Sequence, residues 1–147
     1  MRDLVRILEE YCEDNDIQFE YGSEQHLNLI QGDIDNNRIY LLLFPVTRRT
    51  IANAGSIKVQ GRRYVGRFML LKGSDYANHY FKENNTDQAT SKYTVNIEPL
   101  LTVNESILNG LMCADLEIER HECDDAINVL DANKDGLWCR FVYVQRP

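Results

Sequence analysis

The sequence lacks the motifs by which many enzymes and membrane proteins are identified. No apolar run approaches the roughly 20 residues that a membrane-spanning helix needs, and the N-terminal residues Met-Arg-Asp-Leu-Val lack the apolar core of a secretion signal. The phosphate-binding pattern Gly-x-x-x-x-Gly-Lys is absent. Only three histidines are present, and no hydrolase motif surrounds them. We therefore expect a protein that is not an enzyme, uses no cofactor and does not contact a membrane.

Paired cysteine motifs are also missing. The four cysteines are Cys12, Cys113, Cys123 and Cys139, and no two of them form a Cys-x-x-Cys pair. This distribution predicts four reduced thiols in a protein made in the cytoplasm. His121 and Cys123 could form a zinc site with a distant cysteine, but their spacing differs from that of known zinc motifs. We expect no metal there.

One loop has part of a calcium-binding pattern. Asp131, Asn133, Asp135 and Gly136 match the first half of an EF-hand loop. That loop needs a bidentate glutamate at its twelfth position, which is Val142 here, and it joins helices rather than strands. The residues are those that turns prefer, so the pattern predicts a β-hairpin turn in which Gly136 adopts a positive φ.

Acidic residues are absent from a long central stretch. Residues 36–74 hold eight of the sixteen basic residues and none of the 23 acidic ones, so this stretch carries +8 and the remainder −15. The net charge of −7 thus conceals a strong division of charge along the chain. Such a division is typical of proteins that bind partners through complementary charge.

Hydrophobic periodicity predicts the order of elements. In the first half of the chain we expect a helix over 2–15, strands over 17–21 and 39–44, an arm or hairpin over 46–63 and a strand over 64–72. In the second half we expect a helix over 74–81, a polar stretch over 82–88 that is a linker or part of one longer helix, a helical segment over 91–112, an edge strand over 115–119 and a closing hairpin over 126–144. Pro99 predicts a kink or a helix start nearby, and Gly110 a helix end. Gly66 predicts a bulge or close packing.

The last strand, residues 137–144, is strongly apolar. Its residues alternate between two faces, which places Trp138 on one face and Phe141 on the other. A strand of this kind is expected inside a sheet, paired on both edges and covered on both faces.

Strands and helices are segregated along the sequence rather than alternating strictly. This order predicts one α+β domain over residues 1–147: a mainly antiparallel sheet with an N-terminal helix and a central helical segment packed on it, and a long projecting arm at 46–63. A long connection in a compact domain is typically functional or disordered.

Two classes of function fit this organisation better than catalysis. One is a structural subunit that contacts its neighbours head to tail, with the basic arm of one copy on the acidic body of the next. The other is a nucleic-acid-binding module, because aromatic residues lie within the basic stretch at Tyr64 and Phe68.

Three segments resemble a known group of proteins. They are Lys92-Tyr-Thr-Val-Asn-Ile-Glu-Pro-Leu100, Asp115-Leu-Glu-Ile-Glu119 and Ile127-Asn-Val-Leu-Asp-Ala-Asn-Lys-Asp-Gly136. They are similar to small proteins of Bacteroides phages, which include ring-forming neck or tail proteins of crAss-like phages. The order of elements also looks like that of phage tail-terminator and neck proteins.

The resemblance implies a non-enzymatic virion subunit, made in the host cytoplasm. It would be a head–tail connector or tail terminator in a cyclic ring around the DNA channel, beside other neck, tail or portal proteins. The resemblance carries over no catalytic residues.

The basic residues of the arm are the candidate interaction site. They are Arg48, Arg49, Lys58, Arg62 and Arg63. We predict that the arginines meet carboxylates of an adjacent subunit or ring, because arginine forms paired hydrogen bonds with carboxylates. In the alternative interpretation they face the channel and touch DNA phosphates. A dense positive lining would slow the passage of DNA, which favours protein contact.

Overall fold

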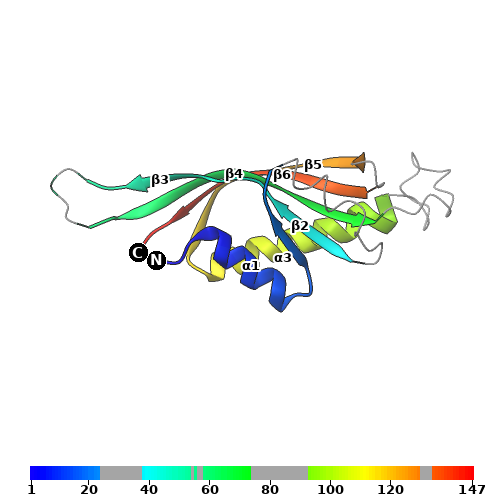
Figure 1. Ribbon diagram of the computed structural model, residues 1–147, viewed down its shortest axis with the longest axis horizontal. Helices are drawn as coiled ribbons and strands as arrows, with labels where there is room; N and C mark the ends of the chain where they lie inside the picture. Colours follow the sequence, from blue (N-terminus) through cyan, green and yellow to red (C-terminus); the bar gives the residue numbers. More distant parts are fainter. Residues whose placement is uncertain (24–37, 54, 56–57, 74–92, 130–133) are drawn as a thin grey trace.

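The structure of the protein is a computed structural model, and it describes residues 1–23, 38–53, 55, 58–73, 93–129 and 134–147. Within these ranges the fold is α+β, with a mostly antiparallel six-stranded sheet and two α-helices (Figure 1). The predicted fold class is confirmed at this level. The predicted helix over 74–81, the linker over 82–88 and the turn residues Asp131 and Asn133 lie outside the described residues.

The described elements follow the predicted order closely. They are α1 (Leu4–Asp14), β1 (Gln18–Tyr21), β2 (Ile39–Leu43), β3 (Thr47–Ile51), β4 (Gly61–Gly73), a π-helical turn η2 (Tyr93–Ile97), α3 (Glu98–Cys113), β5 (Leu116–Val129) and β6 (Lys134–Gln145).

Strand β6 lies between β4 and β5 in the sheet. The strand order is β1-β2-β4-β6-β5, and β3 pairs with β4 outside this path. Strand β1 is parallel to β2, and every other pairing is antiparallel. The prediction that the last strand is paired on both edges is therefore confirmed.

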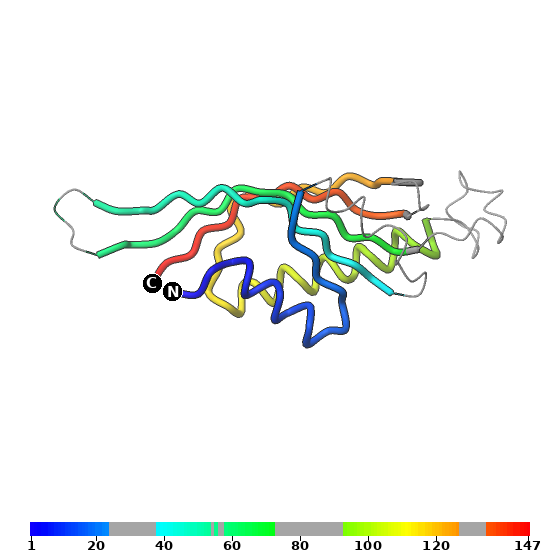
Figure 2. The backbone as a smooth tube through the Cα atoms, viewed as in Figure 1, coloured from blue at the N-terminus to red at the C-terminus, as the bar shows by residue number. Residues whose placement is uncertain are grey.

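Strands β2 and β3 lie one after the other along the same edge of β4. Leu43 is opposite Phe68, and Thr47 is opposite Val65. Pro45 interrupts the pairing between them, because proline has no N–H to donate to the ladder. As a result, the N-terminal part of β4, residues 61–65, forms a hairpin with β3. In Figures 1 and 2 this hairpin extends to the left, past the helices and the two chain termini.

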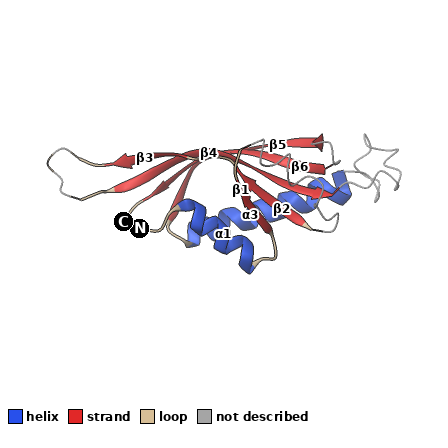
Figure 3. Ribbon diagram, in the orientation of Figure 1, coloured by secondary structure: helices blue, strands red, loops and turns tan. Residues whose placement is uncertain are grey.

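Both α-helices lie on the same face of the sheet, below it in Figure 3. Helix α1 begins after Asp3, whose carboxylate accepts a hydrogen bond from the Val5 N–H at 3.2 Å. Helix α3 begins near Pro99, at a position where the missing N–H of proline is not needed. The predicted helix start near Pro99 is confirmed.

The sheet has a main core on the helix face and a smaller cluster on the other. Alternation along β6 places Phe141 in the main core and Trp138 against the smaller cluster, as predicted. The smaller cluster comprises Tyr40, Leu42, Phe44, Met69 and Leu71. The Trp138 ring lies 5.2 Å from that of Phe44, and Arg67 lies over both rings.

Three glycine predictions have different outcomes. Gly66 fits close packing, because a Cβ there would lie 2.8 Å from the Phe141 ring. The prediction for Gly110 is wrong, because α3 continues to Cys113 and Gly110 is where α3 contacts the ring of Tyr11. The prediction for Gly136 is also wrong. Gly136 lies within β6 without a positive φ, and a Cβ there would lie 2.3 Å from the Leu70 carbonyl oxygen.

The C-terminal strands differ from the prediction in number. The predicted edge strand over 115–119 and the first strand of the predicted closing hairpin are one strand, β5, with register shifts after Ile118 and after Ala126. The hairpin between β5 and β6 is confirmed, with Val129 opposite Lys134. Asp135 is fully buried and accepts a hydrogen bond from Asn96 Nδ2 at 2.7 Å.

Candidate functional site

The base of the β3–β4 hairpin is fixed by Asp3. Besides capping α1, its carboxylate accepts two hydrogen bonds from Arg48, at 2.7 Å from Nε and 2.8 Å from Nη2. Arg62 on β4 lies 3.8 Å from the same carboxylate. One side chain therefore joins the start of the first helix to both strands of the hairpin.

These contacts change the acidity of the groups involved. The hydrogen bond from Arg48 lowers the pKa of Asp3, and the backbone bond from Val5 and the charge of Arg62 act in the same direction. Partial burial of the carboxylate opposes them. The same hydrogen bond raises the pKa of Arg48. Both shifts favour the charged pair.

A second link at the hairpin base is made of neutral groups. The Tyr64 hydroxyl donates to Gln145 Oε1 at 2.9 Å, and Gln145 Nε2 donates to the Arg2 carbonyl at 2.9 Å. Tyr64 and Gln145 are both buried. The link ties β4, the end of β6 and the N-terminal segment together, and it holds the two termini close to one another (Figure 2).

The candidate arginines of the arm lie on two faces of the hairpin. Arg48 and Arg62 are on the helix face with Asp3, and Arg63 on the other face donates to Glu119 of β5 at 2.9 Å. Arg49 is exposed, lies opposite Arg63 across the strands, and forms no ion pair with the described residues. Lys58 is exposed in the connection between the strands. Arg48, Arg62 and Arg63 are thus paired within their own chain.

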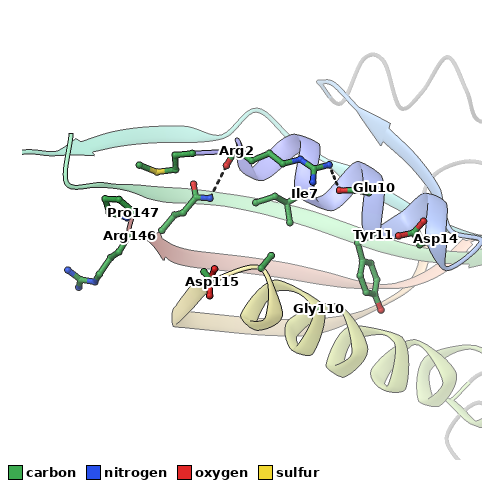
Figure 4. Close-up of a pocket in the computed structure, with 12 residues that line it drawn as sticks. Arg2, Ile7, Glu10, Tyr11, Asp14, Gly110, Asp115, Arg146 and Pro147 are labelled. Carbon is green, nitrogen blue, oxygen red and sulfur yellow. Dashed lines mark hydrogen bonds and ion pairs between the residues drawn. The ribbon is translucent and has the colours of Figure 1, made fainter. Parts of the chain in front are cut away.

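A groove of about 690 Å³ lies beneath the hairpin base, between α1, the end of α3 and the C-terminal residues (Figure 4). Its lining includes an ion pair between Arg2 and Glu10 and the exposed side chains of Asp14, Asp115 and Arg146. These groups are mixed in charge and open to solvent. The groove adds no convergent set of catalytic groups.

A compact polar cluster lies between α3 and the sheet. It consists of Asn104 on α3, His121 and Cys123 on β5, and Cys139 and Tyr143 on β6. His121 and Cys123 are two residues apart in a strand, so both point to the helix face. The register places Cys139 directly opposite Cys123.

The imidazole of His121 is at the centre of this cluster. Its Nε2 lies 2.9 Å from Asn104 Oδ1 and 3.3 Å from Cys123 Sγ, and its Nδ1 lies 2.8 Å from the Tyr143 hydroxyl. The Cys139 thiol donates to Asn104 Oδ1 at 3.8 Å. A ring nitrogen of His121 and the Sγ atoms of Cys123 and Cys139 all lie within 4.8 Å of one another.

The two thiols have different acidities. The hydrogen bond with Cys139 lowers the pKa of Cys123, the contact with His121 lowers it further, and burial opposes both. The pKa of Cys139 is raised, first by that hydrogen bond and then by burial. Cys123 is therefore the thiol that ionises first.

Sequence reasoning considered His121 and Cys123 but found no third ligand at a familiar spacing. Zinc motifs are defined mainly for turns and helices, where ligands lie several residues apart. In a strand the useful spacing is two residues, and the third ligand comes from the neighbouring strand. The His-x-Cys pair therefore indicated two of the three ligands. The strand register that places Cys139 beside them could not be predicted from that pair.

Comparison of the sequence with models of known protein families gave no match, and comparison with curated proteins gave no significant similarity. Among the described residues, no helix is long and apolar enough to cross a membrane.

Proposed function

We propose that this protein is a structural subunit of a ring in the neck or tail of a phage virion, as a head–tail connector or tail terminator. In this proposal the β3–β4 hairpin is an arm that contacts the adjacent subunit. The observation that carries the proposal is the hairpin, which extends past the helices and is anchored at its base by Asp3 (Figure 1).

The exposure of the hairpin supports this role. The side chains of residues 47–50 on β3 are all exposed, and within the described chain β3 pairs only with β4. On its other side the hairpin is backed by β6, since residues 62–65 of β4 also pair with residues 142–145, so its open edge is the outer edge of β3. An open strand edge presents N–H and C=O groups to another chain. Contact with a neighbour would cover this edge.

An arm on one side of the subunit produces a head-to-tail contact. Such heterologous contacts close into a ring when the rotation between subunits permits. Arg49 is the arginine best placed to meet a carboxylate of the neighbour, since Arg48, Arg62 and Arg63 have partners in their own chain. The proposed interface therefore combines the edge of β3 with one arginine rather than four.

Electron microscopy and native mass spectrometry of the full-length protein and of particles containing it test the ring. We expect a closed ring with cyclic symmetry around a central opening. A chain that stays monomeric at every concentration and occupies no ring in particles would refute the proposal.

Site-specific cross-linking tests the arm separately. A photo-reactive amino acid in place of Thr50 should cross-link neighbouring subunits into a ladder of oligomers. The same amino acid in place of Glu13, exposed on α1, is the matched control and should give much less of this product. Rings in which position 50 cross-links to DNA instead would favour the nucleic-acid alternative, and rings without any such cross-link would remove the arm from the interface.

A further inference from the structure

The cluster around His121 has the composition of a metal site. Four atoms with lone pairs converge from three elements: Asn104 Oδ1, His121 Nε2, Cys123 Sγ and Cys139 Sγ. Imidazole nitrogen and thiolate sulfur are the ligands that Zn²⁺ prefers in proteins. Two thiolates and a neutral imidazole would also balance the charge of a divalent ion.

The separations between these atoms suit a tetrahedral ion. With ordinary zinc–ligand bond lengths, a tetrahedron places nitrogen and sulfur about 3.6 Å apart. Cys123 Sγ and His121 Nε2 are 3.3 Å apart, and Cys139 Sγ lies within 4.8 Å of Cys123 Sγ and of a ring nitrogen of His121. Only small rotations of side chains are needed to close such a site.

The surroundings of His121 support the same role. Metal-bound histidines usually hydrogen-bond through their other nitrogen, which fixes the orientation of the ring. Here the Tyr143 hydroxyl lies 2.8 Å from Nδ1, and the ring of Phe68 lies 5.8 Å from the imidazole. In the structure Nε2–H donates to Asn104 Oδ1, because that oxygen only accepts. Binding of an ion requires the other tautomer, in which Nδ1–H donates to the Tyr143 hydroxyl and the Nε2 lone pair is available to the metal.

The site has one half-open side. Cys139 is fully buried, whereas His121 and Cys123 are half-buried on β5, the last strand in the order of the described sheet. An ion can therefore enter from the β5 side without unfolding the core.

We propose that His121, Cys123 and Cys139 bind one Zn²⁺ ion, with Asn104 Oδ1 or a water molecule as the fourth ligand. The ion would join α3, β5 and β6 at one point and stabilise the packing of the helix on the sheet. This site is independent of the hairpin and of the proposed ring.

The test uses the full-length protein, reduced and freed of metal. Titration with Zn²⁺ against a chromophoric chelator should show one ion per chain and a rise in the thermal midpoint. Co²⁺ in place of Zn²⁺ should give the thiolate-to-cobalt charge-transfer band and the visible bands of a tetrahedral site.

Three variants locate the ligands. Cys123→Ser should weaken binding by more than about 100-fold, since even loss of an outer hydrogen bond costs 10–100-fold. Tyr143→Phe removes such a bond and should weaken binding by about 10–100-fold while keeping the charge-transfer band. Cys113→Ser, which removes an exposed thiol outside the cluster, is the matched control and should bind like the natural protein.

Two results would overturn the proposal. One is reduced protein, with any Cys123–Cys139 disulfide broken, that binds neither Zn²⁺ nor Co²⁺. The other is equal loss of binding in Cys113→Ser and Cys123→Ser, which would place the ion elsewhere.

Discussion

Substitutions of Asp3 should distinguish its two contributions to stability, the cap of α1 and the ion pair with Arg48 on the hairpin. Asp3→Ala removes the cap of α1 and the paired hydrogen bonds with Arg48. Loss of an Asp cap costs about 1 kcal/mol. Arg48 is 39% exposed, so solvent screening reduces the ion pair to about 0.5–1 kcal/mol. We expect the free energy of unfolding to fall by about 1.5–2 kcal/mol.

Asp3→Asn distinguishes the two contributions. Asparagine caps helices as well as aspartate does, but it has no charge to pair with Arg48. This variant should lose only about 0.5–1 kcal/mol, the ion-pair part. Asp14→Asn is the matched control, since Asp14 is exposed at the other end of α1, where a negative charge is unfavourable. It should leave stability unchanged or slightly raised.

Urea unfolding followed by the fluorescence of Trp138 measures these differences, because this half-buried ring becomes exposed on unfolding. Hydrogen exchange adds a local measurement. If Asp3 anchors the hairpin, the amides of β3 should exchange faster in Asp3→Asn than in Asp14→Asn.

The contribution of Asp3 should depend on pH in a defined direction. Its pKa is lowered in the folded protein, so the unfolded chain takes up the proton first as pH falls. The stabilisation is complete above the ordinary pKa of about 4 and disappears as pH falls through the lowered folded value. The difference between the natural protein and Asp3→Asn should therefore shrink below pH 4. A difference that stays constant or grows there, or an Asp3→Ala variant as stable as the natural protein, would refute this account.

Two glycines should respond unequally to alanine. Gly136→Ala places a methyl group 2.3 Å from the Leu70 carbonyl oxygen, and since backbone cannot rotate away, we expect a loss near the upper end of the 1–3 kcal/mol range for overpacking. Gly110→Ala meets the ring of Tyr11 at 2.6 Å, and the gain of about 1 kcal/mol in helix propensity should offset most of the cost. Urea unfolding of both variants checks the order, and equal losses would contradict it. Tyr11→Leu should relieve Gly110→Ala but not Gly136→Ala.

The sequence predicted the elements whose periodicity is regular. Alternation around Trp138 and Phe141 correctly placed the last strand inside the sheet with its two rings on opposite faces. The 3.6-residue period predicted a helical segment over 91–112, and the described residues of that range are helical. These patterns succeeded because one buried face fixes the period of a helix or strand.

The errors came from interactions between segments far apart in sequence. Gly136 looked like a turn residue, yet it is required by the close approach of the Leu70 backbone in β4. Gly110 looked like a helix end, yet it is required by Tyr11 on another helix. The register between two strands cannot be read from either strand alone. For this reason the sequence did not show that Cys139 lies beside His121 and Cys123.

Folding offsets part of the positive charge of residues 36–74 with carboxylates from other segments of the chain. Residues 36–74 carry +8, but Arg48 and Arg62 pair with Asp3, and Arg63 pairs with Glu119. The pairing of these arginines orients the hairpin. The bidentate pair of Arg48 with Asp3 is well suited to this because it fixes direction as well as distance. An arm whose charge is partly offset in this way can lie against a neighbour through its strand edge, with less of the long-range attraction that salt would screen. A DNA-binding surface needs the opposite, namely arginines free to exchange with counterions along the phosphate backbone. The internal pairing of the hairpin arginines therefore favours the proposed contact between subunits over contact with DNA.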